Sequence, residues 1–361
     1  MAKAMTGRER LTAVLSGEIP DRIPSTFLCN EYYTNHNPGS GTPIEFMKSV
    51  GADIMDREYE LPFRTTYSGG VEFHQYFENG KTYRVFTTPI GKIFEEYIGA
   101  WGRELPFRQK SWIKDIEDYK VLKYVFEHTH FEPNYDWWDE RDRYIGDDGI
   151  IVPLITDFRS SLEYLMENDQ MQTTMDMADE PELLEEVLSV IRQKNIEACK
   201  IAAKCPAKFL NIWEDSSTTI LSPKLYEKYV LPEMKEFTDI LAEEGKKLIQ
   251  HACGHIKHLM PLMAKEDVVA IESITPLHTG NIVMQDTFDT WGDKFVVIGG
   301  IDPAFFVQCT MEQLEEYVVN MIDGFGEYKR KFILQNSDSL PPGVSRTKVE
   351  KVVEIAKRYT F

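Results

Sequence analysis

The chain lacks long apolar runs, a cysteine framework and an excess of positive charge. No stretch approaches the roughly 20 consecutive apolar residues of a membrane-spanning helix, so we expect no membrane partner. The N-terminal MAKAMTGRERLTAVLSGE has neither the apolar core nor the cleavage site of a secretory signal, and a cytoplasmic location is expected. The five cysteines are widely spaced, which indicates free thiols rather than disulfides.

Acidic residues outnumber basic residues by 59 to 40, and the formal net charge is −19. Because affinity for nucleic acid comes largely from basic side chains, we expect no nucleic-acid partner. An anionic membrane surface is disfavoured for the same reason. Hydrophobic residues make up 42% of the chain, which is enough to build a sizeable core.

Apolar runs that end in polar residues recur along the chain, and the last six are each followed by a segment with helical spacing of apolar positions. This alternation predicts parallel strands, and eight strands close a (β/α)8 barrel, the TIM barrel. We predict an α/β fold with a single barrel domain over residues 1–361. The runs are Arg22–Cys29, Ala52–Glu58, Gly149–Asp157, Lys208–Asp215, Lys247–Gly254, Val268–Pro276, Phe295–Pro303 and Lys331–Asp338.

Between Gly69 and about Phe131 the pattern changes to short alternating aromatic runs around Asn79-Gly80, a hairpin turn signal. This predicts an inserted β-hairpin region near residues 69–131 that caps the barrel. The following stretch Asn134–Tyr144 (NYDWWDERDRY) is either an irregular acidic and aromatic connection or a solvated surface helix.

In α/β barrels the active site lies at the carboxyl ends of the strands, which directs attention to the polar residues that end each run. His251 and Cys253 are two positions apart at the end of the fifth run, so their side chains leave one face of a strand. Glu272, on the sixth run, is the third candidate, and all three are zinc-ligand types. Glu214 and Asp215 end the fourth run, where one is expected at the mouth and the other against a helix N-terminus.

Each candidate also has a purely structural interpretation. His251 and Cys253 fit packed core positions, and Glu272 fits a salt-bridged barrel carboxylate. Asp302 precedes Pro303 and is better explained as a helix N-cap than as a catalytic acid. Ser337, with Asn336 beside it, ends the eighth run and is the candidate for a fourth metal position.

The motifs together resemble the uroporphyrinogen decarboxylase superfamily over nearly the whole chain. They are RERLTAVLSGEIPDRIP, EDSSTTILSPKLYEKYVLPEMKEF, HACGH, IESITPLHTGN, GGIDP and PPGVSRTKVEKVVE. The superfamily includes decarboxylases and zinc-dependent, corrinoid-linked methyltransferases. The arginine-rich motif of the decarboxylases is missing, because the chain reads FLCNEYYTNHN from Phe27 to Asn37. The resemblance therefore implies the methyltransferase branch.

That branch uses a His-x-Cys pair on the fifth strand, as His251 and Cys253 stand here, and often a later cysteine where this chain has Asn336 or Ser337. A Glu on the sixth strand ligates in related zinc sites, and Glu272 matches that context. The resemblance thus implies a Zn²⁺ shell of His251, Cys253 and Glu272 with an open fourth position.

The implied activity is transfer of a methyl group from a small methylated substrate, an aryl methyl ether (O-demethylation) or a methylamine, to the cob(I)alamin of a separate corrinoid protein. Cobalamin enters only through that partner, because the chain has no cobalamin-binding His motif of its own. Glu214 or Asp215 is the expected catalytic residue. The expected substrate-binding residues are Asn30, Tyr32, Tyr33 and Asp338.

Two other functions remain open at this point. A metal-free lyase of the decarboxylase type predicts arginines that converge at the barrel mouth, and a barrel that binds a ligand without turnover fits the missing later cysteine. A homodimer is compatible with the resemblance, because barrels of this kind commonly pair.

Overall fold

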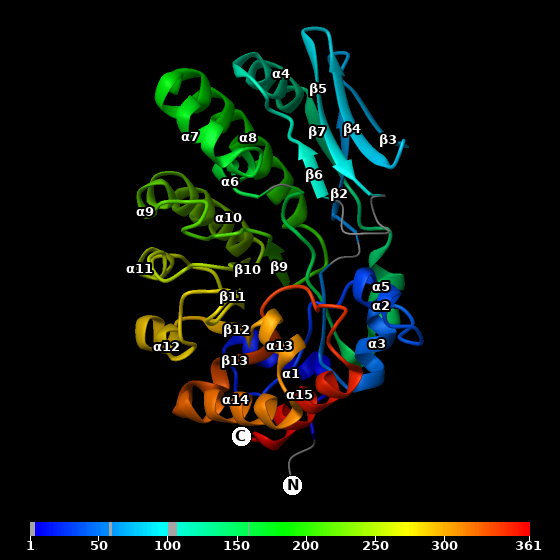
Figure 1. Ribbon diagram of the computed structural model, residues 1–361, viewed down its shortest axis with the longest axis vertical. Coiled ribbons are helices and arrows are strands. Elements are labelled where there is room, and N and C mark those ends of the chain that lie inside the picture. Colours follow the sequence, from blue (N-terminus) through cyan, green and yellow to red (C-terminus); the bar gives the residue numbers. More distant parts are fainter. Residues whose placement is uncertain (1–3, 58–59, 100–106, 158) are drawn as a thin grey trace.

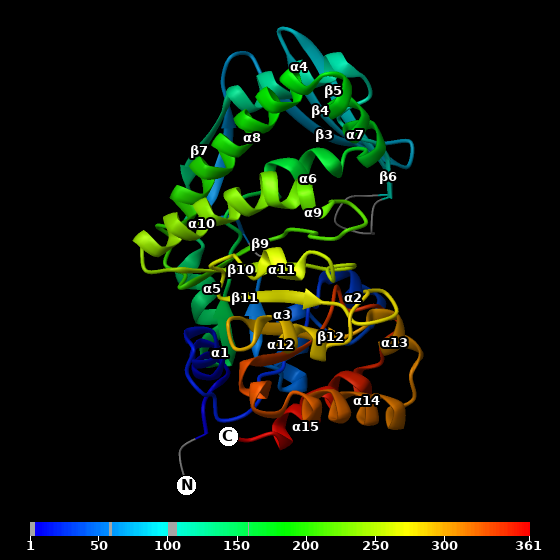
Figure 2. The same ribbon diagram turned by 90° about the vertical axis from the view of Figure 1, so that its left-hand side faces the viewer.

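The computed structural model describes residues 4–57, 60–99, 107–157 and 159–361. Its architecture is α/β, as predicted. Parallel strands flanked by helices form the body, while an antiparallel sheet lies at the end farthest from both termini (Figures 1 and 2). Within the described ranges no helix is both long enough and apolar enough to cross a bilayer.

Every predicted run except the first contains a strand. The run Arg22–Cys29 makes only isolated bridges, because Pro24 has no N–H to contribute to a ladder. Glu58, at the end of the second run, lies outside the described residues. The strands are β1 (Ile54–Asp56), β2 (Phe63–Tyr67), β3 (Glu72–Glu78), β4 (Lys81–Thr88), β5 (Gly91–Ile98), β6 (Phe107–Lys110), β7 (Thr129–Pro133), β8 (Gly149–Ile151), β9 (Phe209–Ile212), β10 (Lys247–His251), β11 (Ala270–Ile274), β12 (Val296–Ile301) and β13 (Phe332–Asn336).

Five of these strands form a parallel sheet in the order β13-β12-β11-β10-β9, and β1 pairs with β8, also in parallel. Isolated parallel bridges join Ser25 to Leu334 and Leu154 to Asn211. The Asp53 amide donates to the Ser25 carbonyl at 2.7 Å. The β1–β8 pair is therefore connected to both edges of the five-stranded sheet.

The antiparallel part consists of a four-stranded sheet, β3-β4-β5-β6, and the separate pair β2-β7. Asn79 and Gly80 join β3 to β4 with φ of 51° and 78°, the left-handed values that a two-residue hairpin turn of this type requires. The segment 100–106 between β5 and β6 lies outside the described residues.

The helices that surround the strands begin with clear caps where the sequence supplies them. Thr6 and Glu9 form a capping box at α1, and Gly17 ends that helix with φ 89°. Asn134–Tyr144 is largely helical rather than an irregular connection, because α5 begins at Trp138. The helices are α1 (Gly7–Ser16), α2 (Glu31–His36), α3 (Pro43–Val50), α4 (Ile116–Glu127), α5 (Trp138–Ile145), α6 (Ser161–Met166), α7 (Gln170–Asp179), α8 (Pro181–Ala202), α9 (Pro223–Leu225), α10 (Leu231–Glu243), α11 (Met260–Met263), α12 (Gln285–Trp291), α13 (Pro303–Gln308), α14 (Met311–Gly324) and α15 (Arg346–Arg358). Shorter turns of helix are η1 (Gly146–Asp148), η2 (Tyr226–Val230) and η3 (Gly326–Lys331).

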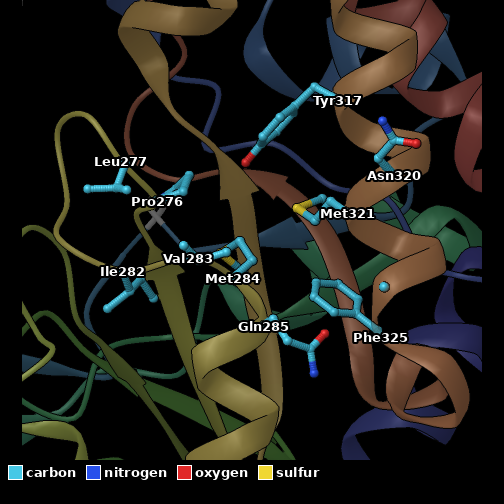
Figure 3. A pocket seen from close by; sticks show the side chains of 11 residues that line it. Pro276, Leu277, Ile282, Val283, Met284, Gln285, Tyr317, Asn320, Met321 and Phe325 are labelled. Carbon is cyan, nitrogen blue, oxygen red and sulfur yellow. The ribbon is translucent and has the colours of Figure 1, made fainter.

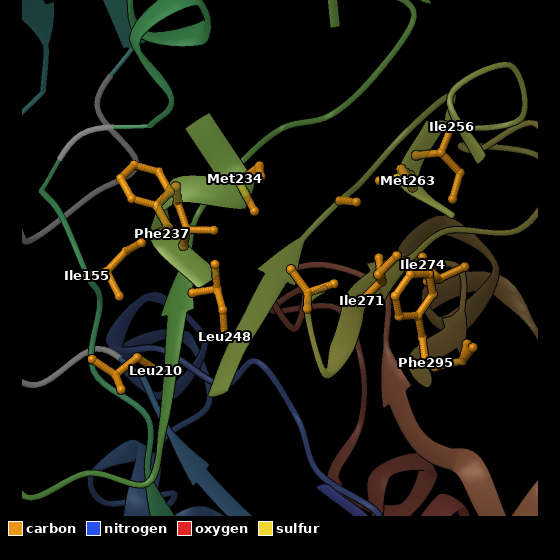
Figure 4. Packing of buried hydrophobic residues seen from close by; sticks show 14 of the residues in the cluster. Ile155, Leu210, Met234, Phe237, Leu248, Ile256, Met263, Ile271, Ile274 and Phe295 are labelled. Carbon is orange, nitrogen blue, oxygen red and sulfur yellow. The ribbon is translucent and has the colours of Figure 1, made fainter. Parts of the chain in front are cut away.

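Both faces of the parallel sheet are buried. Leu248 of β10 belongs to the large core beneath the helices, beside Phe237 of α10 (Figure 4), whereas its neighbour Ile249 belongs to a second cluster that includes Leu11 of α1. Successive strand residues face opposite sides, so each strand supplies both clusters. The sheet is thereby held rigidly, and the residues at its carboxyl ends have fixed positions.

Candidate metal centre

Three side chains of zinc-ligand type converge where β9 and β10 end. Asp215 follows β9, His251 is the last residue of β10, and Cys253 lies two residues later. Their donor atoms all lie within 4.8 Å of one another. Cys253 Sγ is 3.2 Å and His251 Nε2 is 3.8 Å from Asp215 Oδ1. Parallel strands that end at the same edge of the sheet bring these residues together.

Glu272 lies on the other side of His251. Its Oε1 is 3.6 Å from His251 Nδ1 and accepts a hydrogen bond from Asn211, while its Oε2 is 2.8 Å from Nε of Arg57. Burial disfavours ionisation, but the Arg57 charge and the contacts with His251 and Asn211 lower the pKa of Glu272 to about 2. Glu272 therefore lies against one imidazole nitrogen, while the other faces Asp215.

Asp215 is positioned by Arg159, whose Nη2 lies 2.8 Å from Asp215 Oδ2. The same guanidinium binds Glu167 at 2.8 Å and donates to the carbonyl of Trp213 at 3.1 Å. One carboxylate oxygen of Asp215 is thus taken by Arg159, and the other faces Cys253 and His251.

The thiol of Cys253 is half-buried beside this carboxylate. Burial, followed by the negative charge of Asp215, raises the pKa of Cys253. A neutral thiol beside a carboxylate is favoured without a cation, and a bound cation reverses that preference.

Glu214, the neighbour of Asp215, points away from the cluster. It is fully buried and accepts hydrogen bonds from the Ser160 amide at 2.8 Å and the Ser160 hydroxyl at 2.6 Å, at the start of α6. Burial raises the pKa of Glu214 and of the adjacent Glu163. Glu214 and Asp215 both follow the end of β9 and face different surroundings, and the position of Glu214 fits a structural rather than a catalytic role.

Ser337 is engaged by backbone groups. Its hydroxyl donates to the Ile274 carbonyl at 2.6 Å and accepts from the Gly300 amide at 3.2 Å, and the side chain is fully buried. Asn336 accepts from the Leu28 amide at 3.2 Å. Both residues bond to backbone groups at the strand ends. Neither directs a metal-ligating atom at the cluster.

The four residues predicted to bind the substrate lie in different surroundings in the structure. Tyr33 is fully buried against Phe46 and donates to the Val344 carbonyl at 3.1 Å, so it is packed as a core residue. Asn30 caps α2 through the Tyr33 amide, and Tyr32 packs on His36. Asp338 is exposed, and its charge acts on Cys253. Asp302, predicted as an N-cap, accepts from the Phe305 amide at 2.8 Å, which confirms that role.

A cavity of about 550 Å³ lies between the antiparallel sheet and the ends of β8 and β9. Arg159 and Trp213 line it, and Arg159 connects it to Asp215. A second pocket, of about 420 Å³, is apolar and lies between α14 and the connection from β11 to α12, where Tyr317 and Met321 face Met284 (Figure 3). None of the three clustered residues lines either pocket.

Sequence patterns alone do not single out Arg57 or Arg159 for the site. Arg57 follows β1, and Arg159 follows the run that contains β8, so the rule that placed the other candidates at strand ends also applies to them. Arginine is not a metal ligand, so neither residue belongs to a pattern of metal-ligating residue types.

Comparison with known proteins places the chain in a family. The model of the uroporphyrinogen decarboxylase (URO-D) family matches residues 160–359, which include all three clustered residues. The chain belongs to the URO-D family.

Within that class, the chain is similar to the methylcobamide:CoM methyltransferases MtbA of Methanosarcina mazei and Methanosarcina acetivorans. The identities are 25% over 152 residues and 23% over 150 residues. Each match spans 40% of this chain and 40% of the relative, so most of each relative's length lies outside the similarity.

A solved structure, described as a methyltransferase from Methanosarcina mazei, shares the fold. It superposes with a TM-score of 0.63 over 98% of this chain and 99% of its own, at 14% sequence identity. The shared architecture therefore extends through the antiparallel region as well as the parallel sheet.

Proposed function

We propose that the protein is a zinc-dependent methyltransferase that moves a methyl group from a small methylated substrate, an aryl methyl ether or a methylamine, to the cob(I)alamin of a separate corrinoid protein. The observation that carries this proposal is the convergence of the Asp215, His251 and Cys253 donor atoms within 4.8 Å. Membership of the URO-D family and the similarity to methylcobamide:CoM methyltransferases support it.

The donor set fits Zn²⁺. Thiolate sulfur, imidazole nitrogen and carboxylate oxygen are its three usual ligand types, and three protein ligands leave a fourth position for a substrate in catalytic sites. We assign these roles to Cys253, His251 and Asp215. When bound, zinc supplies Lewis acidity toward the heteroatom that carries the methyl group.

Glu272 is assigned outside this shell, in contrast to the ligand role expected from the resemblance. Its carboxylate is already shared by Arg57 and Asn211, and it contacts the imidazole nitrogen opposite the cluster. A carboxylate in this position fixes the tautomer and orientation of a ligating histidine. Arg159 performs a similar task for Asp215 by holding one of its oxygens.

The bridges at Ser25 and Leu154 also support a closed ring of eight strands, with the segment 22–29 as one of them. In such a barrel the cluster lies at the mouth, which is open to a substrate and to a partner protein.

The guanidinium groups nearest the cluster do not favour the lyase. Arg57 is paired with Glu272, and Arg159 is paired with Asp215 and Glu167. Both charges are used inside the protein, whereas a lyase acting on carboxylates requires cations directed at its substrate.

The test is the metal content of the purified protein, with Cys253→Ala and Asp215→Asn as variants and Cys309→Ala as the matched control, since Cys309 lies outside the cluster. We expect about one zinc per chain in the native protein and the control, and loss in both site variants. Native protein that stays free of zinc after supplementation refutes the proposal. Where zinc is present, transfer from methylated substrates to cob(I)alamin is then measured directly.

A further inference from the structure

The cavity beside the cluster has a strongly aromatic wall. Tyr67, Phe86, Trp112, Tyr164 and Trp213 line it, and its volume of about 550 Å³ suits a small molecule. The rings come from two parts of the fold, β2, β4 and the segment after β6 on one side, and α6 and the segment after β9 on the other. Aromatic faces attract cations through their negative electrostatic potential, and quaternary ammonium groups are bound in such surroundings.

Asp157 adds a negative charge to the same cavity. It follows the run that contains β8, lines the cavity and is accessible within it. Among the described residues, no hydrogen bond or ion pair engages its carboxylate. Enclosure by the cavity walls raises the pKa of Asp157, while the charge of Arg84 opposes that change. A cation bound beside this carboxylate would offset the cost of its enclosure.

Three arginines also line the cavity, and all three have carboxylate partners in its wall. Arg84 and Arg108 contact Glu95 at 2.9 and 3.5 Å, and Arg159 contacts Glu167 at 2.8 Å. Arg84 also lies over the Trp112 ring, with 5.6 Å between the guanidinium carbon and the ring centroid. All three guanidinium groups are thus paired with carboxylates of the cavity wall, whereas the Asp157 carboxylate has no such partner among the described residues.

We infer that this cavity binds the methyl donor as a protonated methylamine, with the carboxylate of Asp157 and the surrounding aromatic rings as its recognition elements. Transfer of the ammonium proton to that carboxylate frees the electron pair of the nitrogen for a metal. The inference rests on the proposed function and narrows its substrate to one of the two classes. Arg159 lines the cavity and pairs with Asp215 at 2.8 Å, so one side chain contacts both the cavity and the cluster.

The test measures binding alone, without corrinoid or turnover. Choline and its uncharged carbon isostere 3,3-dimethyl-1-butanol are titrated into the purified protein by calorimetry, with 4-methoxybenzoate as the aryl ether probe. We expect choline to bind at least about tenfold more tightly than either, because the aromatic faces and the Asp157 carboxylate attract its positive charge. Trp112 and Trp213 line the cavity, so their fluorescence provides a second readout.

The variant Asp157→Asn keeps the shape of the side chain and removes its charge, and we expect it to lose about tenfold in choline affinity. The control Asp239→Asn changes an exposed carboxylate on α10 that pairs with Lys235, and its choline affinity should equal that of the native protein. Equal binding of choline and its isostere, tighter binding of 4-methoxybenzoate, or no binding of choline overturns the inference. Methyl transfer from an aryl ether in a protein that does not bind choline would leave the proposed function standing and remove only this inference.

Discussion

Cys253 Sγ lies 3.2 Å from Asp215 Oδ1, although the two residues end different strands and are 38 positions apart. The thiol is protonated more readily than usual in this position, because burial and the carboxylate both raise its pKa. A metal ion that binds there must therefore displace a proton from sulfur.

This relationship predicts that zinc affinity increases with pH. The affinity measured by chelator competition should rise from pH 6 to pH 8 in the native protein, and the rise should be smaller in Cys253→Ser, which has no thiol to deprotonate. Cys309→Ser serves as the control for the loss of a cysteine elsewhere. The same pH slope in all three proteins would contradict the assignment of Cys253 as a ligand.

The lowered pKa of Glu272 predicts that the folded protein loses stability in acid. Its pKa falls from an ordinary value of 4.5 to about 2 in the folded protein, so its stabilising contribution is present above about pH 5 and disappears as the pH falls toward 2. We expect about 2 kcal/mol of the unfolding free energy to be lost from this source between pH 6 and pH 3. Urea denaturation at the two pH values measures it.

The double variant Arg57→Met, Glu272→Gln removes both buried charges. Its unfolding free energy should therefore not show the loss between pH 6 and pH 3 that we attribute to Glu272. The single variant Arg57→Met leaves a buried carboxylate without its cation and should be destabilised by about 3–5 kcal/mol at pH 7. A double variant that loses stability in acid as steeply as the native protein would show that Glu272 is not the responsible group.

The raised pKa of Glu266 predicts the opposite trend, a loss of stability as the pH rises. It is fully buried, accepts a hydrogen bond from Tyr226, and burial raises its pKa to about 8. The unfolded chain releases this proton at a lower pH than the folded protein, so stability declines between about pH 4.5 and pH 8.

Glu266→Gln keeps a hydrogen-bond acceptor and removes the titration. We expect its melting temperature, relative to the native protein, to be higher at pH 8.5 than at pH 5. The difference should correspond to a few kcal/mol in unfolding free energy. Glu227→Gln, at an exposed residue paired with Lys265, is the matched control and should show no such trend. A constant difference at the two pH values would exclude a buried titrating Glu266.

Ser160 provides a test of the structural role of Glu214. The Ser160→Ala variant loses the 2.6 Å hydrogen bond to Glu214 at the start of α6, and we expect a loss of about 1–3 kcal/mol in unfolding free energy. Zinc content and metal affinity should be unchanged, because Glu214 points away from the cluster. Ser161→Ala, which loses the bond to Glu233 at 2.7 Å, is a matched substitution one residue away. Loss of zinc in Ser160→Ala alone would assign Glu214 to the metal centre.

The sequence predicted most of the fold because strands and helices leave periodic patterns. The runs that became β8 to β13 were apparent because strands buried on both faces are continuously apolar. The first run was predicted as a strand, but Pro24 reduces it to bridges. The pattern around α5 fits a helix and an irregular connection equally, because Trp137 and Trp138 lie among charged residues and give no clear apolar face.

The candidate site was predicted less completely, since spacing reveals partners on one strand but not between strands. His251 and Cys253 share a strand end, and their convergence followed from the pleat. The approach of Asp215, and the position of Glu272 beside Arg57, depend on the register and twist of neighbouring strands. Tyr33 was predicted to line a pocket because it is aromatic and near a strand end, yet the turn of α2 directs it into the core.

The aromatic cavity is assembled from two stretches of the chain, one before the family match and one within it. Asp215, His251 and Cys253 fall within the family match at residues 160–359, whereas Tyr67, Arg84, Trp112 and Asp157 precede it. The cavity wall therefore draws on both segments, because Tyr164 and Trp213 lie within the family match. Under the proposed function, a change confined to the earlier segment would alter the cavity and leave the three clustered residues in place.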